Sequence, residues 1–197
     1  GETWQDRQRI LEGYCGAIIN MIQMSRSGPI IVPVQEWRND PDRNVQATYA
    51  SPDNGKTWTR SNVIDLGGNG HHDGGCEGAV IELRDRRLWM LIRTSWDRFW
   101  EAYSMDAGAS WRIIQPTTID ASSAPAYLLR LASGRIALAW NRLYPEGRTS
   151  YQRRSGAYSE DWASWHRAEL AIAFSDDDGS TWTDPAIMAR DEGGVTY

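Results

Sequence analysis

The sequence lacks the features that mark a membrane, nucleic-acid-binding or disulfide-rich protein. No stretch approaches the roughly 20 apolar residues of a membrane span, and residues 1–12 are too polar for a signal peptide. The net charge of -5 comes without a clustered basic face, which argues against nucleic acid as a partner. Two cysteines, Cys15 and Cys76, are too few for a disulfide framework and lack metal-ligand spacing, so a thiol pair and a single bridge both stay open. We expect no metal and no cofactor.

Phenylalanine is scarce too, although aromatic residues are not. The chain has 2 Phe against 11 Trp and 8 Tyr. Rings with a polar edge are favoured in sheet packing and in clefts that face carbohydrate. With 197 residues, of which 41% are hydrophobic, the chain is long enough to bury a sizeable core. The composition therefore favours an ordered domain and makes a sugar a candidate ligand.

One turn motif recurs along the chain. The pattern S-x-D-x-G-x-[ST]-W occupies residues 51–58, 104–111 and 175–182, and residues 1–4 match its second half. In such a turn the Asp accepts hydrogen bonds from backbone N–H groups, the Gly takes a positive φ, and the Trp packs between neighbouring sheets. The motif aspartates are therefore predicted to hold turns and do no chemistry; they are Asp53, Asp106 and Asp177.

The spacing of the motif predicts the architecture. The Trp residues at positions 4, 58, 111 and 182 are separated by 54, 53 and 71 residues. Periods near 50 residues with four strand-like runs each indicate propeller blades. In the middle period we expect strands at residues 79–83, 88–94, 100–104 and 111–115. The first two strands of the other periods are expected at residues 17–24 and 30–35, and at 126–131 and 136–141. The prediction is an all-β fold with about three four-stranded blades, half of a six-bladed ring.

The same periods divide the chain into one partial propeller. The predicted units are an end strand of a preceding blade (1–12), three blades (13–66, 71–120 and 121–190) and the start of a next blade (191–197). The extra length of the third period falls between Leu143 and His166 and includes several Tyr and Trp residues. This long connection is either a lid over a ligand site or a surface insertion, and the sequence leaves both open.

Antiparallel strands separate the turns from a candidate site. The start of the first strand, the end of the second and the start of the third share one end of each blade, the mouth, and the Asp boxes lie at the other. Glu77 precedes the first strand of the middle blade, and Arg93 ends its second strand. Arg167 precedes the third strand of the last blade, and Arg142 also lies on the mouth side. These residues are predicted to converge.

The chain resembles the sialidase superfamily over nearly its whole length. The resemblance is carried by the Asp boxes, by Glu77 with Arg93 following 16 residues later, and by Arg167 ahead of the next box. The resemblance implies a propeller in which three arginines surround the substrate carboxylate, a Glu polarises a Tyr nucleophile, and an Asp is the acid/base. It makes Arg93 and Arg167 two of the arginines, Glu77 the base and Tyr197 the nucleophile. The first arginine and the acid/base Asp belong to an early blade that this chain lacks.

The chemistry suits these residue types. Planar guanidinium groups bind a carboxylate bidentately, so converging arginines form an anion socket. A neutral Tyr attacks an anomeric centre that carries a carboxylate more readily than an anionic nucleophile does, and sialidases are a known exception to the two-carboxylate rule. The partner that we expect is an acidic sugar or sialoglycoconjugate, and a parent sialidase would be extracellular or periplasmic.

The loop at residues 70–78 adds a second set of candidates. Neighbouring His71, His72 and Asp73 rarely point at one metal ion, so we expect hydrogen bonding to sugar by His72 and proton transfer by Asp73. Three functions remain open: a sialidase-like glycoside hydrolase, a non-catalytic carbohydrate-binding or assembly module, and a hydrolase or lyase for another acidic sugar that uses residues 71–73. Exposed sheet edges also predict either a homodimer or the remainder of a longer chain.

Overall fold

A computed structural model describes residues 3, 7–25, 27–70, 72–144 and 167–191. Within these ranges every regular element is a β-strand, and the strands form three four-stranded antiparallel sheets. No helix in the described part of the chain is long and apolar enough to cross a membrane. The all-β prediction with about three four-stranded blades is confirmed.

Each sheet is a simple meander in which every strand pairs with the next strand along the chain. Blade 1 contains β1 (Ile22–Gln23), β2 (Ile30–Arg38), β3 (Arg43–Ser51) and β4 (Thr59–Arg60). Blade 2 contains β5 (Cys76–Glu82), β6 (Leu88–Arg93), β7 (Arg98–Ser104) and β8 (Arg112–Asp120). Blade 3 contains β9 (Tyr127–Arg130), β10 (Ile136–Arg142), β11 (Glu169–Ser175) and β12 (Ala186–Arg190).

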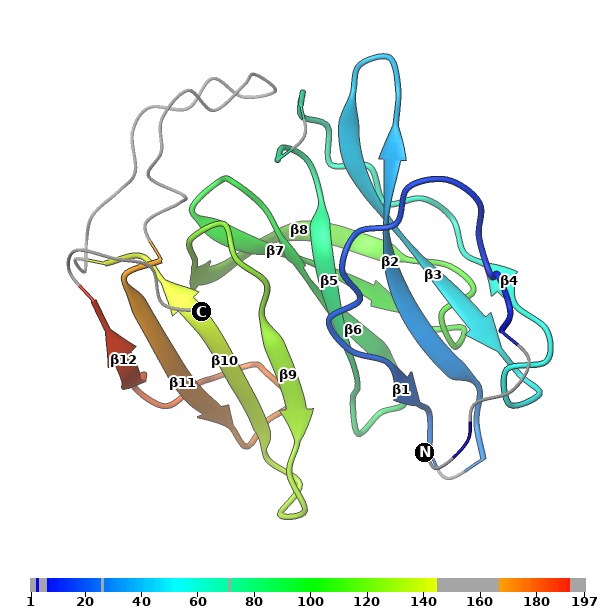
Figure 1. Ribbon diagram of the computed structural model, residues 1–197. Coiled ribbons are helices and arrows are strands. Elements are labelled where there is room, and N and C mark those ends of the chain that lie inside the picture. The colour runs from blue at the N-terminus through cyan, green and yellow to red at the C-terminus, as the bar shows by residue number, and fades with distance from the viewer. Residues whose placement is uncertain (1–2, 4–6, 26, 71, 145–166, 192–197) are drawn as a thin grey trace.

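The two inner strands of blade 2, β5 and β6, are buried on both faces by the neighbouring blades. Successive side chains of a strand point to opposite faces, and in β6 Leu88 and Met90 join a buried cluster with Ile31 of blade 1. Trp89, between them in the sequence, joins a different cluster with Leu138 of blade 3. Figure 1 shows β5 between β9 of blade 3 and β2 of blade 1, and β5 contacts both strands. Two of the buried clusters therefore lie between the blades, one on each side of blade 2.

The Asp boxes close the turns between the third and fourth strands. In the first box, the Ser51 hydroxyl donates to Asp53 Oδ1 (2.9 Å), and Thr57 donates its N–H to Oδ1 (2.8 Å) and its hydroxyl to Oδ2 (2.7 Å). The turns at Asp106 and Asp177 repeat this pattern. The N–H and hydroxyl of Thr57 lower the pKa of Asp53 to about 2. These carboxylates hold their own turns.

The end of each later box packs on the preceding blade. Trp111 of blade 2 is 2% exposed and donates its indole N–H to the Thr48 hydroxyl of blade 1 at 2.9 Å. In blade 3 the ring of Trp182 lies 6.3 Å from that of Trp89 in blade 2. A Cβ on Gly108 would lie 3.2 Å from the side chain of Ile31, so the turn approaches blade 1 closely. The repeat thus sets the order of the blades.

The inner strand of blade 1 differs from the prediction. A strand was expected at residues 17–24, but only Ile22–Gln23 forms one, β1. The Asn20 side chain instead bonds the backbone of Val80 in β5, donating to its carbonyl at 2.7 Å and accepting its N–H at 2.9 Å. Because this side chain satisfies the backbone of the next blade, the segment before β1 is held without a ladder of its own.

Candidate functional site

The mouth end of the molecule is the end at which β2, β6 and β10 finish, at Arg38, Arg93 and Arg142. The antiparallel registers put Cys76 opposite Arg93 at this end of blade 2. The Asp-box turns, which follow β3, β7 and β11, lie at the other end of the sheets. Glu77 and Arg93 therefore lie at the end that the sequence analysis expects.

Glu77 and Arg93 form an ion pair across β5 and β6. Nη1 of Arg93 lies 2.5 Å from Oε2 of Glu77, and the two side chains are 7% and 18% exposed. Glu77 lies in an irregularity of the β5–β6 register with a φ of +37°. A bulge of this kind redirects a side chain, and strained backbone persists where the surroundings hold it. The fold thus aims Glu77 at the arginine.

Three buried amide side chains of blade 1 hold the Glu77 backbone. Gln35 accepts the N–H of Glu77 at 3.0 Å and donates to Asn44 Oδ1 at 2.7 Å. Gln46 accepts the N–H of Gly78 at 3.1 Å and donates to the carbonyl of Gly75 at 3.0 Å. These amides were not predicted as site residues from the sequence. Their signal was polar residues within strands whose neighbours are apolar, which indicates buried hydrogen bonding.

Asp73 lies in the loop before β5, for which the sequence predicts proton transfer. It is 4% exposed, and its carboxylate accepts the N–H groups of Asn69 and Gly74, both at 3.0 Å, and the hydroxyl of Ser95 at 3.2 Å. These contacts hold the loop in place. Proton transfer by Asp73 stays a prediction. His72 is exposed on the same loop, and His71 lies outside the described residues.

Arg93 and Arg167 meet at Ser123, although they belong to different blades. Arg93 Nε donates to the Ser123 hydroxyl at 3.0 Å, and Arg167 Nη2 donates to the Ser123 carbonyl at 2.8 Å. Ser123 is 2% exposed and lies in the connection between β8 and β9. The structure therefore places two of the predicted arginines around one buried serine, which the sequence analysis did not single out.

Arg142 belongs to a neighbouring cluster. Its Nη1 lies 3.3 Å from Oε1 of Glu169, a residue that is 1% exposed. Arg190 donates to the other oxygen of Glu169 from Nε at 3.0 Å and from Nη2 at 2.6 Å, and its guanidinium lies 4.2 Å from the centre of the Tyr144 ring. Arg142 Nε also lies 3.9 Å from Oδ1 of Asp120, so the arginines of this cluster are paired with two carboxylates. Tyr197 and residues 145–166 of the long connection lie outside the described residues.

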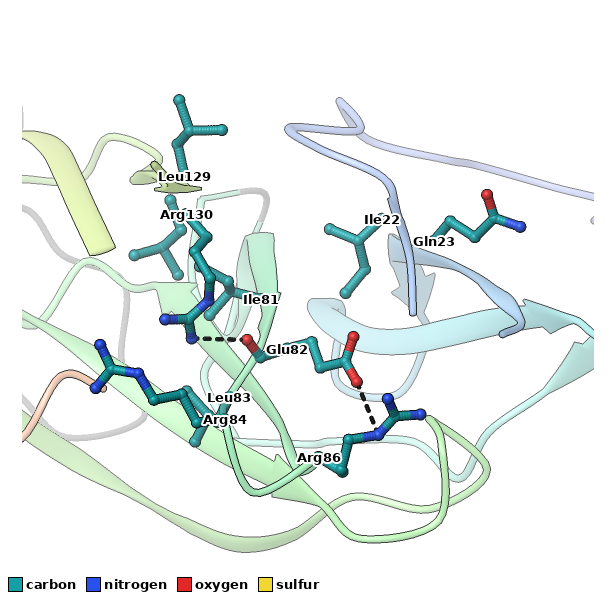
Figure 2. A pocket seen from close by; sticks show the side chains of 10 residues that line it. Ile22, Gln23, Ile81, Glu82, Leu83, Arg84, Arg86, Leu129 and Arg130 are labelled. Carbon is teal, nitrogen blue, oxygen red and sulfur yellow. Dashed lines mark hydrogen bonds and ion pairs between the residues drawn. The ribbon is translucent and has the colours of Figure 1, made fainter. Parts of the chain in front are cut away.

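A groove of about 550 Å³ lies away from these residues. Figure 2 shows side chains that line it, among them Ile22, Ile81 and Leu129 with the charged Glu82 and Arg130. Glu82 is five residues along β5 from Glu77, about 16 Å in a strand. Its carboxylate pairs with Arg86 at 3.1 Å, and its carbonyl accepts from Arg130 at 2.9 Å. The groove is thus at the opposite end of β5 from the arginines of the mouth.

The two cysteines are free, so the bridge left open by the sequence does not form. Cys76 is 2% exposed, and burial raises the pKa of its thiol to about 12. A thiol in this state is a poor nucleophile at neutral pH. Among the described residues, no group of three or more His, Cys, Asp or Glu side chains is arranged to hold a metal ion.

Three Asp-box sheets with this order define a β-propeller protein of the sialidase type. The chain matches the BNR repeat-like domain over residues 1–197 and belongs to this family. The resemblance to the sialidase superfamily is thereby confirmed. No curated protein matches the chain significantly.

Solved structures show the same fold at low identity. A protein of unknown function from Dyadobacter fermentans DSM 18053 has a TM-score of 0.60 at 18% identity, over 89% of this chain and 42% of its own. The Hadza microbial sialidase Hz136 has a TM-score of 0.57 at 18% identity, over 87% and 30%. Trypanosoma rangeli sialidase in complex with 2,3-difluoro-KDN has a TM-score of 0.50 at 18% identity, over 78% and 22%. The chain therefore spans less than half the length of each of these structures.

Proposed function

We propose that this chain is a sialidase-like glycoside hydrolase scaffold that recognises an acidic sugar through Arg93 and Arg167. The observation that carries the proposal is the meeting of both guanidinium groups at Ser123, beside the Glu77–Arg93 ion pair. Two guanidinium groups that converge from neighbouring blades suit a carboxylate, which accepts planar, charge-assisted hydrogen bonds. T. rangeli sialidase, which has the same fold, is described in complex with 2,3-difluoro-KDN.

In this proposal Glu77 is the base and Tyr197, outside the described residues, is the nucleophile. Arg93 contacts Oε2 of Glu77, so we assign Oε1 to the phenol of Tyr197. A carboxylate that accepts the phenol proton makes the oxygen of Tyr a better nucleophile. His72 and Arg142 are assigned to outer contacts with the sugar, because both lie at the mouth end. Asp73 holds the loop between them and Glu77.

A non-catalytic carbohydrate-binding or assembly module is the second candidate. The observation that favours it is the outward face of blade 3, where Tyr127 and Leu129 are 50% and 47% exposed. Apolar surface of this kind is typical of an interface. We propose that a second copy of the chain, or the remainder of a longer chain, covers this face. The proposed blades are residues 13–66, 71–120 and 121–190, with residues 1–12 and 191–197 belonging to the neighbouring blades.

A fluorogenic sialoside assay, run beside titrations with N-acetylneuraminic acid and a uronic acid, separates the candidates. Hydrolysis that falls at least about 100-fold in Tyr197→Phe and in Glu77→Gln supports the enzyme. Binding without turnover, lost in Arg93→Ala, supports the binding module. Preference for the uronic acid would replace sialic acid with another acidic sugar, and the absence of binding to either would overturn acidic-sugar recognition. Light scattering at micromolar concentration tests whether a second copy of the chain binds, since a stable monomer contradicts a homodimer.

A further inference from the structure

Ser123 has an unusual position between the two proposed anion-binding arginines. It lies in the short connection that leads from β8 of blade 2 to β9 of blade 3. Its hydroxyl accepts a hydrogen bond from Nε of Arg93, which ends β6. Its carbonyl accepts one from Nη2 of Arg167, which precedes β11. One residue thus contacts the guanidinium groups of two blades.

These contacts restrict how Arg93 can lie. Its guanidinium is held from Nε by Ser123 and from Nη1 by Glu77, at 3.0 and 2.5 Å. Two contacts on different nitrogen atoms fix both the direction and the rotation of the planar group. Among the contacts of Arg93 with described residues, none uses Nη2, which leaves that nitrogen for a ligand oxygen.

We propose that Ser123 is a positioning residue that sets the placement of Arg93 relative to Arg167, and so the affinity of the mouth for a sugar carboxylate. This inference rests on the proposed function and deepens it. A long arginine side chain loses rotamer freedom when it binds an anion, and a group that is already oriented loses less. Ser123 supplies this orientation without contacting the sugar.

The neighbouring serine provides a matched control. Ser122 is 1% exposed, and its hydroxyl donates to the carbonyl of Asn141 in β10 at 3.1 Å. Both serines are buried and hydrogen-bonded in the same connection, but only the hydroxyl of Ser123 contacts an arginine. Ser122→Ala removes a buried neutral hydrogen bond from the same connection, so it controls for a loss of stability there that spares the arginines.

The test compares Ser123→Ala, Ser122→Ala and Ser123→Thr by calorimetric titration with N-acetylneuraminic acid. The Ser123→Ala variant is expected to bind about tenfold more weakly, because a hydrogen bond to a charged group is lost. The Ser122→Ala variant is expected to stay within about twofold of the wild type. Ser123→Thr keeps the hydroxyl and restores most of the affinity. Equal affinities of the two alanine variants would overturn the inference.

A second measurement separates failure of this inference from failure of the proposed function. Side-chain NMR of the full chain reports the exchange of the Arg93 Nε–H with water, with no sugar present. Faster exchange in Ser123→Ala than in Ser122→Ala supports the positioning of Arg93, and equal exchange overturns it. If the wild-type chain binds no acidic sugar, the proposed function fails, whereas the exchange rates still decide the orientation of Arg93. If Ser123→Ala does not fold, Ser123→Gly, which also lacks the hydroxyl, takes its place. Weaker affinity and faster exchange of the Arg93 Nε–H than in Ser122→Ala support the inference, and equal values overturn it.

Discussion

Arg93 Nη1 lies 2.5 Å from Glu77 Oε2, so the two residues that bracket β5 and β6 at the mouth form a nearly buried ion pair. Such a pair is worth little by itself, because both groups lose their hydration when they are buried. Its structural support is extensive, since Gln35 holds the backbone of Glu77 and Ser123 holds the side chain of Arg93. The side chain of Arg93 and the backbone of Glu77 are therefore held from outside their own blade, as the proposed site requires.

Replacement of Arg93 by lysine tests the planar guanidinium itself. Lysine keeps the charge, but its single ammonium nitrogen lacks the planar fork that places Nε on Ser123 and Nη1 on Glu77. We expect Arg93→Lys to weaken binding of N-acetylneuraminic acid by about ten- to a hundredfold, measured by calorimetric titration. Arg38→Lys is the control, because Arg38 ends β2 in the same way and is exposed. Equal losses in the two variants would contradict a specific role for Arg93.

The acid stability of the fold depends on the Asp boxes. Hydrogen bonds from Thr57 and Thr181 lower the pKa of Asp53 and Asp177 to about 2, against the usual 3.8. A carboxyl group whose pKa is lower in the folded state stabilises that state above the ordinary pKa. The stabilisation is lost as the pH falls from about 4 towards 2.

Urea unfolding between pH 7 and pH 2 measures this loss. We expect the variant with Asp53→Asn and Asp177→Asn to be less stable at pH 7 and to lose less stability between pH 4 and pH 2 than the wild type does. Asp184→Asn is the control, because Asp184 is an exposed aspartate outside the boxes. Parallel curves for the wild type and the double variant would show that the boxes do not contribute to the acid response.

The blades were predictable from the sequence, whereas the residues that hold Glu77 and Arg93 in place were not. The Asp box is a local motif, so its period gives the number and order of the sheets without knowledge of distant contacts. Gln35 and Ser123 act on residues 42 and 30 positions away, and such contacts depend on how the blades pack. The expected strand at residues 17–24 failed for the same reason, because Asn20 binds Val80 of another blade.

Trp111 tests whether the boxes connect blades as well as close turns. Its ring is buried between blades 1 and 2 and donates to Thr48. We expect Trp111→Ala to lower the free energy of unfolding by about 3–5 kcal/mol, as other large-to-small core changes do. Trp111→Phe keeps much of the apolar area but loses the hydrogen bond. We expect it to lower the free energy of unfolding by about 1–2 kcal/mol.

Trp58 occupies the same position in the first box and is the matched control. It is only half-buried, and its indole N–H is shared between Gln8 Oε1 and the Gly55 carbonyl of its own turn, both at 3.2 Å. Trp58→Ala should therefore cost less than Trp111→Ala in urea unfolding. A cost for Trp58 that equals or exceeds that for Trp111 would show that the ring stabilises its own turn rather than the boundary between blades.

The two thiols are expected to differ in reactivity. Cys15 is exposed, whereas Cys76 is 2% exposed and its pKa is raised to about 12 by burial. Since the thiolate is the reactive form, Ellman's reagent at pH 8 should modify one thiol of the native chain quickly and both in denaturant. Cys15→Ser should abolish the fast phase, and Cys76→Ser should leave it unchanged. A native chain in which both thiols react together, or neither reacts before reduction, would contradict the buried, unbridged state of Cys76 beside Glu77.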